Sequence, residues 1–240
     1  TGVYTTRLVG SVRCVQEKAD SPWRRTVTDR PRRDIIAAVG ATASLTLAGC
    51  LGGGGSGTEA DAVALTDHPL GENLGDWPHL GPDPFEAPAT LVVLDDPSCS
   101  RCAAFHQNTV AELESEYVAR GELAIAVRPY PVVYAWGEPA AHALEATQSR
   151  DDAAFWSLLG HYFAEQSSFG TDNVLAKTET WLGDNTDLDA TAIVDDARSE
   201  VFADRINAKL SAGEEAGAGD ITPATFAFVD GTLKTSFNGS

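Results

Sequence analysis

The sequence predicts an α/β fold, and three observations support that prediction. An apolar run at Thr90–Leu94 leads into Cys99-Ser100-Arg101-Cys102, where a helical pattern begins. A long segment of helical periodicity follows, at about residues 132–212. Two short strand-like runs, Ala224–Val229 and Leu233–Phe237, then flank an Asp-Gly turn signal. Strands and helices that share one core in this way are typical of the α/β class.

Residues 1–49 are interpreted as an N-terminal extension followed by an export signal, and they are excluded from the fold. Arg32-Arg33 precede a short, weakly apolar stretch that ends in Leu47-Ala48-Gly49-Cys50. Paired arginines before such a stretch are typical of twin-arginine export. The last four residues resemble a lipobox, in which Cys50 would be lipidated. An ordinary buried helix is the alternative, but residues 50–58 form a Gly-rich tether that a core helix would not need.

The charge of the remaining chain restricts its partners. Residues 50–240 contain 9 Lys+Arg and 31 Asp+Glu, a net charge of −22. A domain this acidic should repel nucleic acid and anionic lipid surfaces, so neither is an expected ligand. The acids are spread along the chain and Lys is scarce, a pattern similar to that of proteins from salt-loving microbes. We therefore expect a halophilic protein whose surface repulsion is screened by salt.

Residues 59–240 predict a single domain, and its elements can be taken in order. A Gly-, Pro- and Asp-rich lead-in is expected to wrap the domain, with a short strand at Ala62–Leu65. The first buried strand covers the apolar run that precedes the cysteines. Ser100–Ala119 predicts one helix, because its apolar residues recur at a spacing of four. Leu123–Val127 alternates in polarity and predicts the second strand.

The helical insertion, at about 132–212, carries four apolar stripes that we interpret as core packing. Ala212–Asp220 is then expected to be a Gly-rich loop. It leads to Ile221-Thr222-Pro223, which stands at the start of the next strand. The C-terminal hairpin completes the domain.

Two cysteines carry most of the functional information. Cys14 lies upstream of the predicted cleavage site and Cys50 would be lipidated, so the domain retains only Cys99 and Cys102 as thiols. A cysteine at a helix start has free backbone N–H groups and the positive end of the helix dipole near its sulfur, which favours the thiolate. The second cysteine lies one turn later, within reach of the first. Arg101 adds a positive charge that should lower the pKa further.

Three other roles for the pair are weighed against redox chemistry. A structural zinc site needs four ligands, and His106 would supply only a third. Covalent haem attachment needs His directly after the second cysteine, where Ala103 stands. A structural disulfide remains open, although so short a loop removes little chain entropy. We therefore expect no metal and no cofactor.

The segment Asp95–Cys102, together with Thr222-Pro223-Ala224-Thr225-Phe226 downstream, resembles the thioredoxin superfamily, and the long helical segment between them resembles its DsbA-like branch. The resemblance implies a thioredoxin-like fold with an inserted helical subdomain. It implies that Cys99 attacks and Cys102 resolves. It also implies a cis peptide bond before Pro223, with the backbone of Thr222 pairing to a substrate strand.

The resemblance leaves some roles open. Asp95 or Asp96 could be the proton-handling acid near the second cysteine, but a solvated turn carboxylate is the favoured interpretation. His106, His142 and His161 fall in helical patterns and are interpreted as partly buried or surface residues. The family usually has a final helix that packs on the sheet after the hairpin, whereas this sequence ends at Ser240, soon after the hairpin. Where that helix is missing, apolar sheet surface should be exposed.

Together these observations predict an exported, lipid-anchored thiol–disulfide oxidoreductase on the extracytoplasmic face of the cell membrane. Its partners would be exported protein thiols and disulfides and an unidentified membrane redox partner. Disulfide formation is the first choice of direction, although the Ser-Arg dipeptide between the cysteines leaves direction open. An extracytoplasmic reductase or isomerase is the second enzyme hypothesis. A non-catalytic binding lipoprotein with a structural disulfide is the hypothesis from another class.

Overall fold

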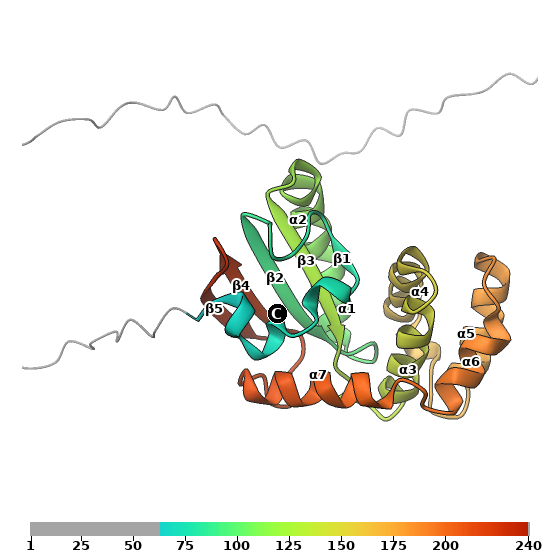
Figure 1. Ribbon diagram of the computed structural model, residues 1–240. Coiled ribbons are helices and arrows are strands. Elements are labelled where there is room, and N and C mark those ends of the chain that lie inside the picture. The colour runs from blue at the N-terminus through green and yellow to red at the C-terminus, as the bar shows by residue number, and fades with distance from the viewer. Residues whose placement is uncertain (1–62, 240) are drawn as a thin grey trace, which may run out of the picture. The chain divides into compact units, whose positions relative to one another are not determined.

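The computed structural model describes residues 63–239 (Figure 1). The predicted export signal, the Gly-rich tether and the lipidation site Cys50 lie outside the described residues. No helix within the described residues is long and apolar enough to cross a membrane.

A five-stranded mixed sheet forms the centre of the domain, with strand order β1-β3-β2-β4-β5. The strands are β1 (His79–Leu80), β2 (Ala89–Asp95), β3 (Leu123–Pro129), β4 (Ala224–Val229) and β5 (Thr232–Asn238). β2 and β3 are parallel, whereas β1, β4 and β5 run antiparallel to their neighbours. The strands predicted from apolar runs are therefore confirmed. β1, a two-residue edge strand, was not predicted because it is too short to carry a periodic pattern.

Alternation along β2 gives the sheet two separate cores. Leu91 and Val93 face one core, and Val92 and Leu94 face the other. Both faces are covered, which explains why this strand is apolar throughout instead of alternating. The outer strand β5 is mostly exposed, and its exposed residues are polar apart from Phe237.

Each face of the sheet is covered by a different set of helices (Figure 1). The helices are α1 (Ser100–Phe105), α2 (Ala111–Glu116), α3 (Gly137–Gln148), α4 (Asp152–Ala164), α5 (Val174–Asn185), α6 (Ala190–Arg198) and α7 (Ala203–Glu215). Buried residues of α1 and of α3 to α6 share the first core, so the helical insertion packs against the Cys-x-x-Cys helix. α7 packs with the lead-in over the second core. This is the thioredoxin-like fold with an inserted helical subdomain that the sequence predicts.

The lead-in differs from its prediction. The strand expected at Ala62–Leu65 is absent from the described part, where Ala64 makes only an isolated bridge to Thr232 and Leu65 begins a 3-10 turn. Three short 3-10 turns follow one another: η1 (Leu65–Asp67), η2 (Pro69–Gly71) and η3 (Leu74–Asp76). They bury apolar side chains in the second core, so the lead-in wraps the domain as expected.

The single helix predicted at Ser100–Ala119 is interrupted. A π-helical segment, η4 (His106–Val110), separates α1 from α2, and the backbone N–H of Ala111 donates to the carbonyl of His106, five residues earlier. The side chain of Asn108 donates to the carbonyl of Ala104 at 2.7 Å. The four-residue spacing of the apolar residues did not reveal this insertion.

The prediction of a loop at Ala212–Asp220 is wrong about where the loop starts, because α7 continues to Glu215. Gly213 lies inside the helix, where a Cβ atom would collide with the ring of Tyr130. A glycine that reads as a loop residue in the sequence therefore permits close packing of α7 on the sheet.

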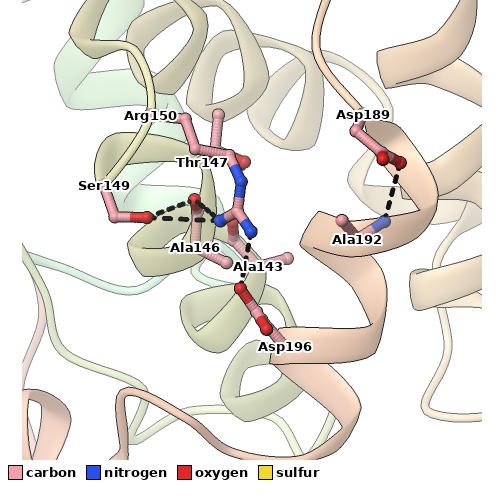
Figure 2. Close-up of polar contacts among 8 residues, drawn as sticks. All are labelled: Ala143, Ala146, Thr147, Ser149, Arg150, Asp189, Ala192 and Asp196. Atoms are coloured by element: carbon pink, nitrogen blue, oxygen red, sulfur yellow. Dashed lines mark hydrogen bonds and ion pairs between the residues drawn. The ribbon is translucent and has the colours of Figure 1, made fainter.

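Within the helical subdomain, polar contacts join α3 to α6 (Figure 2). Arg150 donates to the carbonyl of Ala146 at 2.7 Å, at the end of α3, and pairs with Asp196 of α6 at 2.6 Å. Asp189 caps the N-terminus of α6 by accepting from the N–H of Ala192 at 3.0 Å. These contacts fix the end of α3 against α6.

Candidate active site

The two cysteines lie where β2 ends and α1 begins. Cys99 is the N-cap residue of α1 and has extended backbone angles, and Cys102 lies one turn later with no exposure at all. Both are free thiols. β4 runs antiparallel to β2, so the start of β4 lies at the same edge of the sheet. This brings Thr222 beside the cysteines, and in the thiol form Cys99 Sγ donates to its carbonyl at 3.4 Å. The Thr222–Pro223 peptide bond is cis.

The loop before the first cysteine is held by Asp96. One carboxylate oxygen accepts from the N–H and the hydroxyl of Ser98 at 2.7 and 2.5 Å. The other accepts from the N–H groups of Val132 and Val133 at 2.8 and 2.7 Å. Asp96 therefore joins the loop after β2 to the loop after β3, and its charge is neutralised by four donors.

Gln166 holds the same loop from the helical subdomain. Its side-chain amide donates to the carbonyls of Pro97 and Cys99 at 2.9 and 3.0 Å. Gln166 lies in η6 (Gln166–Ser168), directly after α4. The position of the loop that carries Cys99 therefore depends on the helical subdomain as well as on the sheet.

The surroundings of Cys99 stabilise its thiolate and lower its pKa to about 5. The largest cause is the hydrogen bond from the thiol of Cys102, and burial acts in the opposite direction. The side chain of Thr222 also lowers the pKa; its buried hydroxyl has no other partner in the described part of the chain. The backbone N–H groups of Arg101 and Cys102 contribute as well. At neutral pH Cys99 is a thiolate.

Burial raises the pKa of Cys102, and the neighbouring Cys99 and the negative charge of Asp95 raise it further. Cys102 is therefore a protonated thiol that donates to the Cys99 thiolate. The two sulfurs thus differ in protonation.

Asp95 and Asp96 are both fully buried, so their interpretation as solvated turn carboxylates is wrong. The two carboxylates do different things, because Asp96 organises the loop whereas Asp95 lies close enough to raise the pKa of Cys102. One oxygen of Asp95 contacts His106 Nε2 at 2.6 Å. The other is buried and has no hydrogen-bond partner among residues 63–239.

Arg101 acts differently from the prediction, since its side chain is exposed and its contribution to the pKa of Cys99 comes through its backbone N–H. His142 is buried and His161 is half-buried, and both lie in the helical subdomain. Among the described residues, no cluster of three or more His, Cys, Asp or Glu side chains is arranged to hold a metal ion.

Sequence reasoning missed His106 and Gln166 as parts of this site. His106 follows Cys102 at a helical step of four, which signals a shared face, but that spacing was considered only for metal binding. Gln166 gave no local signal, since its two partners lie 69 and 67 residues earlier in the chain.

A Cys-x-x-Cys at the start of a helix, a cis-proline beside it and a central mixed sheet together define a thioredoxin-like protein. A family model described as Thioredoxin matches residues 79–227, which is more than half of the chain. The chain therefore belongs to the thioredoxin family. A comparison with curated proteins finds no match.

Solved structures with the same fold include DsbA-type proteins. Oxidised BdbD from Bacillus subtilis is 20% identical with a TM-score of 0.57, and the alignment covers 67% of this chain and 85% of BdbD. DsbA from Chlamydia trachomatis is 18% identical with a TM-score of 0.57, covering 66% and 84%. The thiol-disulfide exchange protein α-DsbA2 from Wolbachia pipientis is 17% identical with a TM-score of 0.53, covering 71% and 86%. The fold of this chain is thus the DsbA-like form of the thioredoxin fold.

Proposed function

We propose that the chain is an exported thiol–disulfide oxidoreductase that forms disulfides in extracytoplasmic proteins through Cys99 and Cys102. The observation that carries this proposal is the asymmetry of the two sulfurs. The pKa of Cys99 is lowered to about 5, whereas burial raises that of Cys102. Cys99 is then the thiolate that meets the substrate, and Cys102 is the thiol that closes the internal disulfide.

The low pKa of Cys99 favours oxidation of the substrate. A stable thiolate is a good leaving group, and it stabilises the reduced form of the pair relative to its disulfide. The disulfide therefore accepts two electrons readily from substrate thiols. Each such turnover leaves Cys99 and Cys102 reduced, so a membrane redox partner must remove the two electrons.

Exposed apolar side chains beside the site support a polypeptide substrate. Tyr134 is 63% exposed and its backbone N–H donates to Ser98 in the active-site loop at 3.1 Å. Val133 precedes it, and Ile221 precedes Thr222; both are also exposed. An unfolded chain could contact these side chains while pairing with the backbone of Thr222, a mode that tolerates many sequences.

The direct test is oxidation of a reduced, unfolded protein that needs disulfides for its activity. We expect two substrate thiols to be lost for each Cys99–Cys102 disulfide reduced, and no oxidation by Cys99→Ser. Reduction of insulin without oxidation of the reduced substrate would instead support the reductase. A pair that exchanges with neither substrate would support the binding lipoprotein.

Location and salt preference form the rest of the proposal. The twin-arginine signal and the lipobox support attachment through Cys50 on the extracytoplasmic face of the membrane. The net charge of −22 on residues 50–240 supports function at high ionic strength, where repulsion is screened. The melting temperature should then rise from low to molar KCl, and a melting temperature independent of salt would contradict the halophilic part.

A further inference from the structure

We propose that His106 is a proton-relay residue, which connects the buried Asp95 to solvent and so supplies and removes the proton of Cys102. This inference rests on the proposed thiol–disulfide exchange and adds to it a route for the proton. The need for a route is physical. Cys102 is fully buried, and each opening or closing of the disulfide changes its protonation.

The inner half of the route runs from Asp95 to Cys102. Asp95 ends β2, is fully buried and acts on Cys102 through its charge. Its Oδ1 has no hydrogen-bond partner among the described residues, although burial of an unpaired carboxylate oxygen is costly. Its Oδ2 is 2.6 Å from His106 Nε2. The carboxyl group can therefore take a proton on one oxygen and give one up from the other.

The outer half of the route is His106 itself. Its side chain is 14% exposed, against 0% for Asp95. The ring packs on Phe163 of α4 at 4.9 Å and lines a surface cavity of about 300 Å³ with residues of the same helix. Two titratable groups lie beside His106, Asp95 of β2 and Cys102 of α1. The backbone carbonyl of Cys102 accepts from the backbone N–H of His106.

The π-helical segment makes the contact distinctive. His106 is the first residue of η4, at the place where the regular helix that begins at the cysteines is interrupted. Single π-helical turns of this kind occur frequently at functional sites. The helix therefore has the thiolate of Cys99 at its start and the imidazole of His106 at its first irregular turn. The thiolate accepts a hydrogen bond from Cys102, and the imidazole contacts Asp95.

A substrate thiolate attacks Cys99 Sγ of the disulfide; the substrate–Cys99 bond forms, the Cys99–Cys102 bond breaks, and its electron pair leaves on Cys102 Sγ. The carboxylate of Asp95 takes a proton from His106 and passes it to this sulfur. His106 regains one from solvent, so both end unchanged. When Cys102 attacks instead, the same proton leaves along the reverse route.

The test measures how fast a single-cysteine peptide opens the disulfide of the oxidised full chain, by acid quench and mass spectrometry. We expect His106→Ala to slow opening by about a hundredfold, the lower end for a positioned acid or base. Added imidazole should restore the rate with saturation. Pyrazole, a ring of the same size that is far less basic, should not restore it. In an Asp95→Asn background, His106→Ala should have no further effect.

His161→Ala is the matched control, because its half-buried ring also lies 4.9 Å from an aromatic neighbour, Trp181, but in a different cavity. It should keep the wild-type rate and ignore imidazole. If His106→Ala fails to fold, His106→Gln, which keeps a donor but cannot relay a proton, replaces it. A wild-type rate in the His106 variants, or equal rescue by pyrazole, would overturn the relay alone. An unreactive wild-type disulfide would overturn the proposed function as well.

Discussion

Cys99 Sγ lies 3.4 Å from the carbonyl oxygen of Thr222, although the two residues are 123 positions apart in the chain. The contact exists because β4 runs antiparallel to β2, so that the start of one strand meets the end of the other. The thiolate and the backbone that would hold a substrate strand therefore share one edge of the sheet.

The two cysteines should fail differently when replaced by serine. Cys99→Ser should lose all exchange, because a hydroxyl is not ionised at neutral pH and cannot replace the thiolate. Cys102→Ser should still attack but has no internal thiol to release the partner. It should accumulate mixed disulfides, seen as high-mass bands on a non-reducing gel that disappear with reductant. Trapping by Cys99→Ser instead would reverse the assigned roles.

The free energy of unfolding of the reduced protein, minus that of the oxidised protein, should increase with pH. The pKa of Cys99 is about 5 when folded and 9.0 in the reference state. Because the folded pKa is the lower one, the stabilisation is fully present above the unfolded pKa and is lost as pH falls through about 5. Between these limits the unfolded chain binds the extra proton, so the slope is about 1.4 kcal/mol per pH unit.

Denaturant unfolding of both redox forms from pH 5 to pH 8 measures this slope, and the difference between the forms cancels the other titrating groups. Reduced Cys99→Ser is the control and should show no such slope relative to the oxidised wild type. A difference that is constant with pH would mean that Cys99 is not a stabilised thiolate.

A buried ion pair joins α7 to α3. Lys209 donates to Glu145 of α3 and lies 3.4 Å from the centre of the Trp77 ring, and both charged side chains are 1% exposed. Burial is the main cause that lowers the pKa of Lys209 to about 7. Lys209→Met should destabilise the fold by about 3–5 kcal/mol, since it leaves a buried carboxylate without its partner.

Denaturant midpoints test this prediction, with the exposed pair of Arg120 and Glu122 as the comparison. Arg120→Met should change stability by less than about 1 kcal/mol. Combining Lys209→Met with Glu145→Leu should recover most of the loss, because no unpaired charge remains. A single Lys209→Met variant as stable as the wild type would show that the pair contributes nothing.

The lipid anchor makes a separate prediction about location. Cys50→Ala should release the protein from the membrane fraction or leave the leader uncleaved. Replacing both Arg32 and Arg33 by Lys should block export if the twin-arginine route is used. Fractionation and the apparent mass of the processed chain measure both effects. Unchanged membrane attachment of Cys50→Ala would exclude the lipobox interpretation.

The fold and the cysteine pair could be predicted because their signals are local. Apolar periodicity indicated the strands and helices, and the Cys-x-x-Cys lies at a strand-to-helix junction. The burial of Asp96 could not be predicted, since its partners Val132 and Val133 lie 36 and 37 residues later. The contact of His106 with Asp95 joins a helix to the end of the preceding strand, and hydrophobic periodicity does not encode such a polar pair. Gly213 reads as a loop residue until the ring of Tyr130 is seen beside it.

The most direct test of the account is the reduction potential of the Cys99–Cys102 pair, measured at pH 7 by equilibration with glutathione buffers and alkylation. A thiolate with a pKa of about 5 stabilises the reduced form. We therefore predict an oxidising potential, between about −200 and −100 mV, toward the value of about −120 mV for DsbA. A potential at or below the value of about −270 mV for thioredoxin would contradict the account.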